Sequence, residues 1–395
     1  MTWLSVEIIF WIFIFIAFYT YIGYGMLLYF LVKIKELVKG KHILSLPNDL
    51  PEVTLLIAAY NEQDIIAAKM NNTLSLDYPP ERLKIVWVTD GSNDKTCELL
   101  SAYKDVEVLF EPTRMGKSAA LNRAMNFIHT PIVVFTDANT MICSEAIKEI
   151  VTQFTDPKVG CVAGEKRVAQ LSMQDATAGE GIYWKYESTL KDLDYRLYSA
   201  VGAAGELFAI RTSLFVQLPN DTLLDDFVMS MKIAQKGYKI SYCSRAYALE
   251  NASADISEES KRKIRISAGG IQSVVRLYPL LNIFRYGILS FQYISHRVLR
   301  WSITPLLVFL LLPLNIYLAI KLGFTSLYGV VLLFQGLFYL LGICGYILNR
   351  RKIKNKLMFI PYYFLFMNLS VLRGVLYLQS HKGSGVWEKA QRKNG

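Results

Sequence analysis

The distribution of apolar and polar residues divides the chain into three parts. Residues 6–32 form an almost uninterrupted apolar stretch, and three more lie near the C-terminus at 302–320, 324–348 and 357–378. A helix needs about 20 apolar residues to cross a bilayer, so each stretch predicts a membrane span. Between them, residues 50–260 carry short apolar runs that alternate with amphipathic stretches, a pattern typical of a water-soluble α/β domain.

Basic residues beside the apolar stretches set the expected orientation. Lys33, Lys35 and Lys39 directly follow the first stretch, and residues 349–356 are strongly basic. Lys and Arg collect on the cytoplasmic side of spans, so we expect the N-terminus outside and residue 33 onward in the cytoplasm. No basic leader segment or small-residue cleavage site marks a removed signal peptide. The sequence therefore predicts an integral protein of the cell inner membrane with a cytoplasmic body.

The C-terminal region allows more than one topology. Residues 278–300 are apolar but contain three arginines, which predicts an amphipathic helix in the membrane interface. If 302–320 and 324–348 form an out-and-back hairpin, 357–378 should leave the cytoplasm, yet the tail at 381–395 is basic. Three interpretations stay open: 357–378 is re-entrant, 278–300 crosses the membrane, or the tail departs from the charge rule.

Net charge is distributed unevenly along the chain. The total is +10, but residues 261–395 hold 19 Lys or Arg against the single acidic residue Glu388, a net +18, while the first 260 residues sum to −8. The basic residues flank hydrophobic spans, so they indicate contact with anionic lipid. No nucleic-acid-binding module surrounds them, and we expect no nucleic acid among the partners.

The body is expected to form a parallel sheet covered by helices on both faces. Apolar runs predict strands, and amphipathic stretches between them predict helices over 62–74 and 117–128; such alternation is typical of parallel sheets. The predicted strands are 53–60, 84–89, 106–110, 132–136 and 159–164. Ligands of such sheets bind at the carboxyl ends of the strands, so the polar residues that follow each strand are the candidates for function.

Three polar clusters occupy those positions. Asn61-Glu62 follows the first strand, residues 90–94 (DGSND) follow the second, and Asp137-Ala138-Asn139 follow the fourth. Any one cluster is typical of a turn, but three at one sheet edge favour a site. Carboxylate and amide oxygens suit Mg²⁺ or Mn²⁺, which share such ligands with substrate phosphates.

Three further segments could complete this chemistry. Lys117 follows Gly116 at a predicted helix start, where anions are favoured, although Glu111 stands where a P-loop needs glycine. Asp225-Asp226 is either a helix cap or a source of a general base, and residues 261–266 (KRKIRI) form either a membrane-surface helix or a clamp for a pyrophosphate. The sequence has no HExxH, no GxSxG and no zinc-site spacing.

In this order, the motifs resemble the membrane-embedded family 2 glycosyltransferases, which include hyaluronan, cellulose and poly-N-acetylglucosamine synthases. The resemblance rests on six segments and covers nearly the whole chain. The segments are 58–62 (AAYNE), 90–96 (DGSNDKT), 116–122 (GKSAALN), 137–139 (DAN), 205–206 (GE) and 224–226 (LDD). It implies a GT-A, Rossmann-like α/β catalytic domain with N- and C-terminal transmembrane helices, and inverting transfer from a nucleotide-sugar, a UDP-sugar, to a glycan or lipid-linked acceptor.

The resemblance also implies roles for individual residues. Asp226 is the expected base, and Asp137 with Asn139 is the expected Mg²⁺ or Mn²⁺ site. The implied acceptor residues are Gly205, Glu206, Asp225 and Ile266. The implied donor-binding residues are Tyr60, Asn61, Glu62, Asp90, Ser92, Lys117, Asp137, Arg262 and Arg265.

Two departures from the family pattern affect the expected product. The D-x-D motif is D-A-N here, so metal binding should depend mainly on Asp137. The QxxRW motif of processive members is replaced by residues 262–266 (RKIRI), where Ile266 offers no ring for sugar stacking. A segment at 386–392 resembles a C-terminal Trp/Arg segment that could reach the donor phosphates. Transfer to a polyprenyl phosphate, single-sugar addition, or an inactive membrane scaffold of the same fold are the alternatives to polymer synthesis.

The expected organisation has five parts, without indication of partner subunits. They are an N-terminal transmembrane helix (1–35), a cytoplasmic GT-A domain (36–277), an interfacial helix (278–300), about three transmembrane helices (301–380) and a basic tail (381–395).

Overall fold

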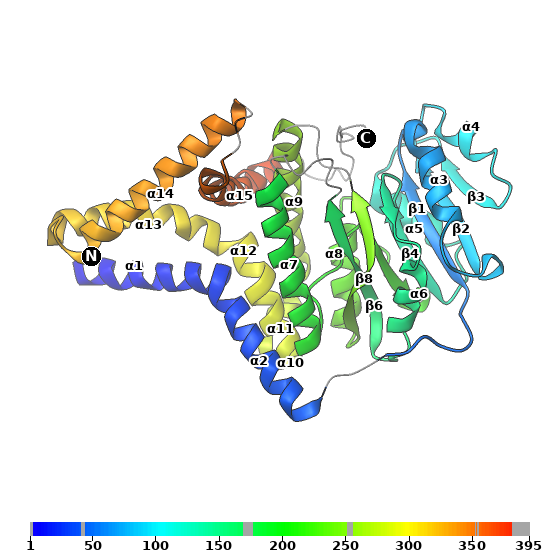
Figure 1. Cartoon of the computed structure of the whole chain (residues 1–395), viewed down its shortest axis with the longest axis horizontal. Coiled ribbons are helices and arrows are strands. Elements are labelled where there is room, and N and C mark those ends of the chain that lie inside the picture. The colour runs from blue at the N-terminus through cyan, green and yellow to red at the C-terminus, as the bar shows by residue number, and fades with distance from the viewer. Residues whose placement is uncertain are drawn as a thin grey trace.

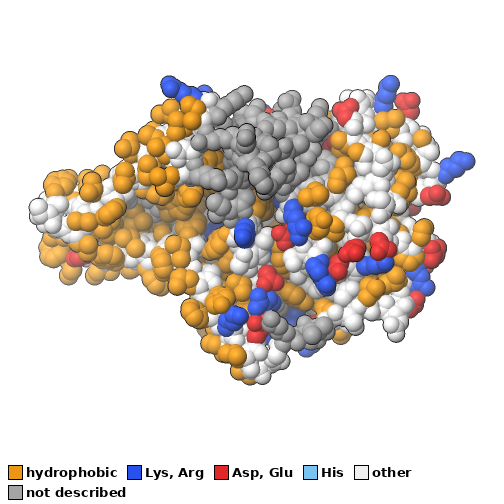
Figure 2. All heavy atoms as spheres, viewed as in Figure 1, with side chains coloured by type: hydrophobic (Ala, Val, Ile, Leu, Met, Phe, Trp, Pro, Cys, Tyr) orange, Lys and Arg blue, Asp and Glu red, His pale blue; other side chains and the backbone are white. Residues whose placement is uncertain are grey.

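The computed structural model describes residues 3–40, 44–168, 177–250, 256–351, 353 and 355–380. Long apolar helices form an arm at the left of Figure 1, and an α/β unit built on one sheet lies at the right. Hydrophobic side chains cover the surface of the arm in Figure 2, whereas charged side chains gather on the α/β unit. The basic tail and its 386–392 segment fall outside the described residues.

Four parallel strands form the first half of the sheet, in the order β3-β2-β1-β4. They are β1 (Val53–Ala59), β2 (Leu83–Asp90), β3 (Val106–Glu111) and β4 (Ile132–Asp137). Each matches a predicted strand to within about one residue. Their carboxyl ends meet at one edge, which brings the polar segments after β1, β2 and β4 together as predicted.

The second half of the sheet makes it mixed, so the expectation of a purely parallel sheet was wrong. Strand β7 (Phe208–Arg211) pairs antiparallel with both β4 and β6 (Val159–Val168), and β8 (Lys239–Glu250) pairs parallel with β6. The short β5 (Thr140–Ile142) runs antiparallel to β8. Strands β5 and β7 have three and four residues, too few for an apolar period to reveal, and a period never reports strand direction.

Helices cover both faces of the sheet. Along β1, Leu55 and Ile57 pack in the cluster that contains residues of α3 (Ile66–Leu74) and α6 (Ala146–Gln153). Leu56 packs instead with residues of α5 (Lys117–Met125) and α8 (Asp225–Gln235). Because both faces are apolar, the strand lies fully inside the protein. Helix α4 (Thr96–Leu100) contributes Leu100 to the first of these clusters.

Two helices of 21 residues connect the α/β unit to the arm. Helix α7 (Thr177–Leu197) packs against α2 (Tyr24–Lys39), and α9 (Ile256–Arg276) packs against α15 (Lys356–Ser380). At the far end of α2, the Lys35 ammonium donates to the carbonyl of Arg196 at 2.6 Å, and Glu36 forms an ion pair with the Arg196 guanidinium. The C-terminal end of α2 is therefore fixed to the C-terminal end of α7.

The four predicted spans are all helical. Helix α1 (Trp3–Phe18) continues through a π-helical turn (Tyr19–Gly23) into α2 (Tyr24–Lys39). The C-terminal spans are α13 (Ile303–Leu322), α14 (Leu327–Arg350) and α15 (Lys356–Ser380). Within the described part of the chain, these four segments are long and apolar enough to cross a membrane.

The single amphipathic helix expected over 278–300 is broken into short pieces. A 3-10 turn (Tyr278–Leu281), α10 (Ile283–Tyr286), α11 (Ile288–Tyr293), a π-helical turn (Ile294–Val298) and α12 (Leu299–Trp301) follow one another. Gly287 has a φ of 53°, which ends α10. Leu280, Tyr293 and His296 are buried in the protein, whereas Tyr278, Ile283, Phe284 and Ile288 are exposed. The segment therefore packs internally and also presents apolar side chains at its surface, and its place in the membrane interface stays a prediction.

Helix α15 is the part of the arm that contacts the α/β unit most closely. In Figure 1 it is seen nearly end-on, whereas α1 and α13 run across the view, so it takes a different direction from them. A Cβ added at Gly374 would lie 2.8 Å from the Ala268 nitrogen and 3.0 Å from the Ser267 Cβ of α9. The glycine therefore allows the two helices to touch backbone to backbone.

We expect Gly374→Leu to lower the thermal unfolding midpoint of the detergent-purified protein by several degrees. The added side chain must push α15 away from α9, and overpacking of this kind costs about 1–3 kcal/mol. Gly336→Leu is the control, because no atom lies within 4 Å of a Cβ built there. Equal midpoints for the two variants would contradict the close packing.

Candidate functional site

A cavity of about 640 Å³ begins at the carboxyl ends of β1, β2 and β4 and extends past α7 and α9 to α15. Most of the residues that we predicted for the site line this cavity. They are Tyr60, Glu62, Asp90, Lys117, Asp137, Asn139, Gly205, Glu206, Asp225, Asp226, Arg262, Arg265 and Ile266. Residues brought together from 60 to 266 along the chain thus surround one space.

Asn61 and Ser92 do not line the cavity and instead tie two loops together. The Asn61 backbone N–H donates to Ser92 Oγ at 3.1 Å, and the Asn61 and Asn93 side chains and backbone exchange bonds of 2.8 and 2.9 Å. Asn61 has a φ of 53°, a left-handed conformation that Asn tolerates. In this structure the two residues fix the shape of the loops after β1 and β2.

Asp90 both lines the cavity and holds the loop before α5 (Lys117–Met125). Its carboxylate accepts bonds from the backbone N–H groups of Met115 at 3.1 Å and Gly116 at 2.7 Å. The Arg114 guanidinium lies 3.7 Å from the centre of the Tyr60 ring. Arg114 was not predicted from the sequence, because an isolated loop arginine carries no pattern. Together these groups form a rigid wall beside the β1 and β2 ends.

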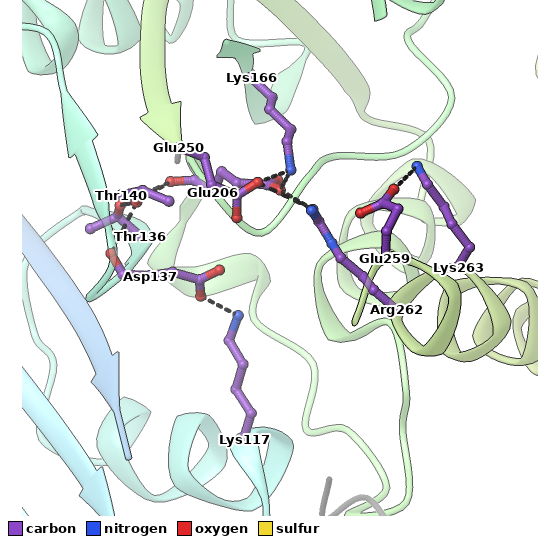
Figure 3. Close-up of polar contacts among 10 residues, drawn as sticks. All are labelled: Lys117, Thr136, Asp137, Thr140, Lys166, Glu206, Glu250, Glu259, Arg262 and Lys263. Carbon is purple, nitrogen blue, oxygen red and sulfur yellow. Dashed lines mark hydrogen bonds and ion pairs between the residues drawn. The ribbon is translucent and has the colours of Figure 1, made fainter. Parts of the chain in front are cut away.

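A partly buried lysine faces several carboxylates at the centre of the site. The Lys117 ammonium lies 2.7 Å from Asp137 Oδ1 and 3.7 Å from Asp225 Oδ2, and Figure 3 shows the first of these contacts. Burial by itself lowers the pKa of Lys117, but Asp137, Asp225 and Asp226 outweigh it and raise that pKa. Lys117 therefore stays charged.

Asp226 is the group best placed for proton transfer. It lies in the first turn of α8 (Asp225–Gln235), and its Oδ1 accepts the Phe227 N–H at 2.7 Å. Burial and the neighbouring charge of Asp225 raise the pKa of Asp226 to about 7, although Lys117 opposes them. A carboxylate with this pKa can accept a proton near neutral pH.

Lys117 and Asp226 both approach the backbone of Gly205 closely. A Cβ built at this position would lie 3.3 Å from the Lys117 Nζ and 3.4 Å from Asp226 Oδ2. Both charged atoms pass directly over the glycine backbone, so a larger residue would separate them. Asp226 and Lys117 thus meet at the loop that we predicted for the acceptor.

A buried polar cluster lies beneath the turn that carries Asp137 and Asn139. Lys69 of α3, which is fully buried, donates to the Thr140 carbonyl at 2.6 Å and lies 3.4 Å from Thr136 Oγ1. The two threonine hydroxyls are 2.9 Å apart, and Thr136 also donates to the Glu206 carbonyl at 2.9 Å. Lys69 therefore supports the Asp137 turn from below, a role that no local pattern in α3 predicts.

Glu206, predicted at the acceptor side, belongs to a buried ion-pair network. Lys166 of β6 contacts both Glu206 and Glu250, and Arg262 lies 3.4 Å from Glu206 and 3.2 Å from Glu250 (Figure 3). Burial would raise the pKa of Glu206, but Lys166 and Arg262 lower it overall. Two cations thus balance two carboxylates here, and α9 is tied to the ends of β6 and β8.

A second network, which the sequence did not reveal, lines the cavity from α7. Glu187 contacts Arg297 at 2.5 Å and Arg300 at 3.2 Å. His296 lies between Glu187, at 3.2 Å, and Asp194, at 2.6 Å. Trp184, Glu187 and Lys191 are spaced so that they share one face of α7. That spacing is the sequence pattern from which this network could have been predicted.

An aromatic ring lies close to the position where the sequence lacks one. Ile266 and Trp301 both line the cavity. The Trp301 ring packs edge-on against Phe227 with centroids 4.9 Å apart, and a Cβ at Gly270 would lie 2.5 Å from it. Trp301 therefore rests on α9 one turn beyond Ile266.

The side chains present are compatible with a divalent cation shared with a substrate. Asp137 and Asn139 offer a carboxylate and an amide oxygen to the cavity. Among the described residues, no group of three or more His, Cys, Asp or Glu has the geometry to hold a metal ion. A cation here would need further oxygen ligands from a phosphate, which is how Mg²⁺ and Mn²⁺ commonly bind.

Comparison with known proteins gives one consistent family. Residues 51–269 match the family model described as "Glycosyltransferase like family 2". The poly-beta-1,6-N-acetyl-D-glucosamine synthase of Staphylococcus epidermidis is 26% identical over 318 residues, 76% of each chain. The synthase of the same name from Staphylococcus aureus strain MSSA476 is 27% identical over 274 residues, covering 67% of this chain and 65% of the relative.

A solved structure shares the fold over nearly the whole chain. The mannosyltransferase PcManGT from Pyrobaculum calidifontis, in complex with GDP-Man and Mn²⁺, aligns with a TM-score of 0.70. It is 21% identical and covers 95% of this chain and 99% of its own. The mixed sheet is thus the GT-A fold predicted from the motifs. The chain belongs to glycosyltransferase family 2.

Proposed function

We propose that this chain transfers a sugar from a nucleotide-sugar to a hydroxyl group of a glycan or lipid-linked acceptor, with inversion at the anomeric carbon. The observation that carries the proposal is the set of carboxylates Asp90, Asp137 and Asp226 around one cavity, the last with a pKa near 7. An inactive scaffold of this fold has no need to keep all three.

The donor is expected to lie along the carboxyl ends of β1, β2 and β4. Asp90 and the Tyr60–Arg114 pair flank the nucleoside end, while Lys117 and Arg265 face the diphosphate. Asp137 and Asn139 would hold a Mg²⁺ or Mn²⁺ ion. When bound, such an ion supplies positive charge that neutralises the departing nucleotide.

The chain's own groups can perform the proton transfer. The Asp226 carboxylate accepts the proton of the acceptor hydroxyl, whose oxygen then attacks the anomeric carbon from the face opposite the leaving diphosphate. Asp225 keeps the pKa of Asp226 high, and Lys117 holds the two carboxylates near Asp137. The donor is proposed to be a UDP-sugar, with UDP-N-acetylglucosamine first in a screen because the relatives are named for that sugar.

We also propose an inner-membrane location with the α/β unit in the cytoplasm. The basic residues after the first span support this orientation. Helix α15 takes a different direction from α1 and α13 and packs on α9 of the cytoplasmic unit. That arrangement favours the re-entrant interpretation of 357–378, which would leave the basic tail in the cytoplasm.

Asp226→Asn should lower kcat by about 10²- to 10⁴-fold, because the acceptor hydroxyl loses its base. Transfer is measured with radiolabelled UDP-N-acetylglucosamine and purified protein reconstituted into membranes. Calorimetry with UDP and Mn²⁺ checks that the variant still binds the nucleotide. Asp105→Asn, an exposed carboxylate of the same unit, should behave as wild type. Unchanged transfer by Asp226→Asn would rule out the assigned base.

The pH profile should report the charge of Asp225. In the wild type, kcat/KM rises with pH through the pKa of Asp226 and levels off above it, because only the deprotonated form accepts a proton. Asp225→Asn removes the neighbouring negative charge that raises this pKa, so the inflection should move to lower pH by on the order of one unit. An unmoved inflection, or a move to higher pH, would contradict the assignment.

Lys69→Met should weaken the Mn²⁺ dependence of donor binding. The variant leaves the buried Thr140 carbonyl without its donor, which costs about 1–3 kcal/mol and lets the Asp137 turn shift. We expect the Mn²⁺ concentration for half-maximal UDP binding, measured by calorimetry, to rise severalfold.

Two comparisons distinguish a role of Lys69 in positioning the Asp137 turn from a role in overall stability. UDP binding without Mn²⁺ should stay as in the wild type, and exposed Lys95→Met should change neither measurement. Loss of UDP binding with and without Mn²⁺ alike would show that Lys69 supports only the fold.

A further inference from the structure

The cavity carries opposite charges at its two ends. At the strand ends, the cations Lys117 and Arg265 face Asp137, Asp225 and Asp226, an excess of negative charge that suits a metal-bound diphosphate. At the α7 wall the balance is reversed. The cations there are Lys191, Arg297 and Arg300, and the carboxylates are Glu187 and Asp194.

Lys191 is the least compensated of these cations. Its side chain lines the cavity although the residue is only 6% exposed. Within the described ranges of the chain, the structure records no hydrogen bond and no ion pair within 4 Å for its ammonium group. A buried ammonium without a counter-ion is costly, and the cavity is the space in which a counter-ion can sit.

The neighbouring carboxylates are engaged elsewhere. Glu187 is shared by Arg297, Arg300 and His296. Asp194 accepts from Tyr24, from Gln292 at 3.0 Å and from His296 at 2.6 Å. Even with His296 neutral, the three cations of this wall have only Glu187 and Asp194 as the wall's own carboxylates, so the wall keeps a net positive charge toward the cavity. Glu187, Glu206 and Asp226 act on Lys191 only from beyond ion-pair distance.

Beyond this wall the cavity becomes apolar and reaches the arm. One face of α15 contributes Ile360, Phe364, Met367 and Val371 to the lining, and Tyr21 of the first span lies opposite. The Tyr21 hydroxyl donates to Asn368 of α15, so the two helices meet at this point. These surfaces suit a hydrocarbon chain that enters from the bilayer.

We propose that the α7 wall, with Lys191, Arg297 and Arg300, binds the phosphate of a lipid-linked acceptor whose hydrocarbon chain lies along α15. The proposal rests on the function given above and names the class of its acceptor. A lipid phosphate supplies the missing negative charge at the wall and the apolar chain beyond it in a single molecule. A neutral polysaccharide would leave the buried ammonium uncompensated.

The donor diphosphate is the competing occupant of this wall. Its own charges are matched at the other end of the cavity by the Asp137 turn, Lys117 and Arg265. Lys191 lies near enough to Asp226 for that carboxylate's charge to act on it. A phosphate at Lys191 therefore holds the acceptor with its hydroxyl group beside the base.

Binding of lipid to the full-length protein tests the proposal directly. Native mass spectrometry in detergent would compare undecaprenyl phosphate with undecaprenol, which has the same chain without the charge. The wild type should prefer the phosphate, and Lys191→Met should weaken phosphate binding by about tenfold while leaving undecaprenol unchanged. Lys191→Arg keeps the charge and should restore the preference.

Three controls give every outcome a meaning. Lys185→Met, on the exposed face of α7, should bind both lipids as the wild type does. UDP binding with Mn²⁺ should survive Lys191→Met; its loss, with phosphate binding intact, would assign the wall to the donor and overturn the proposal. Equal binding of the two lipids by the wild type would overturn it too.

The proposed function can fail separately from this inference. Absence of UDP binding in every variant, including the wild type, would count against the transferase function while the lipid preference still decides the role of Lys191. The thermal midpoint of Lys191→Met should not fall, since burial and Arg297 together disfavour the charged ammonium more than the attraction of Glu187, Glu206 and Asp226 favours it. A lower thermal midpoint together with loss of both lipid and UDP binding would show that Lys191 only stabilises the fold.

Discussion

The ammonium group of Lys117 lies between carboxylates of β4 and α8, 2.7 Å from Asp137 and 3.7 Å from Asp225. Burying any one of these charges alone would be costly, and they compensate one another only when α5, β4 and α8 meet at one point. Gly205 makes this possible because it adds no side chain where Lys117 and Asp226 approach. The position of the proposed base therefore depends on this cluster.

Mutual compensation of buried charges also joins the apolar arm to the α/β unit. The Glu187 and Asp194 carboxylates of α7 are held by residues of the 288–301 segment and, through Tyr24, by the first span. Close contact of α15 with α9 at Gly374 adds a second connection. Because both connections border the cavity, the arm forms part of the cavity lining as well as anchoring the α/β unit. A lipid-borne acceptor of the kind proposed above would reach Asp226 along this lining.

Sequence patterns predicted the features that depend on local order. The four spans, the strands β1 to β4 and β6, and the polar residues at their ends were all placed by apolar runs and motif order. The antiparallel β7 and the broken helix over 278–300 were not, because an apolar period does not report strand direction or distinguish lipid from protein interior. Asn61 and Ser92 matched a motif, but the fold uses them to tie two loops together.

The sequence by itself determined the family, the membrane segments and the carboxylates of the site, because each leaves a signal in neighbouring residues. Only the tertiary structure decided how charges from distant segments are paired. Lys69 beneath the Asp137 turn, and Lys191 beside Arg297, appear in the sequence as ordinary helix lysines. Their roles come from their burial and from which charged or polar groups lie near them in the fold. The hydrophobic and polar pattern of the neighbouring residues reports neither property.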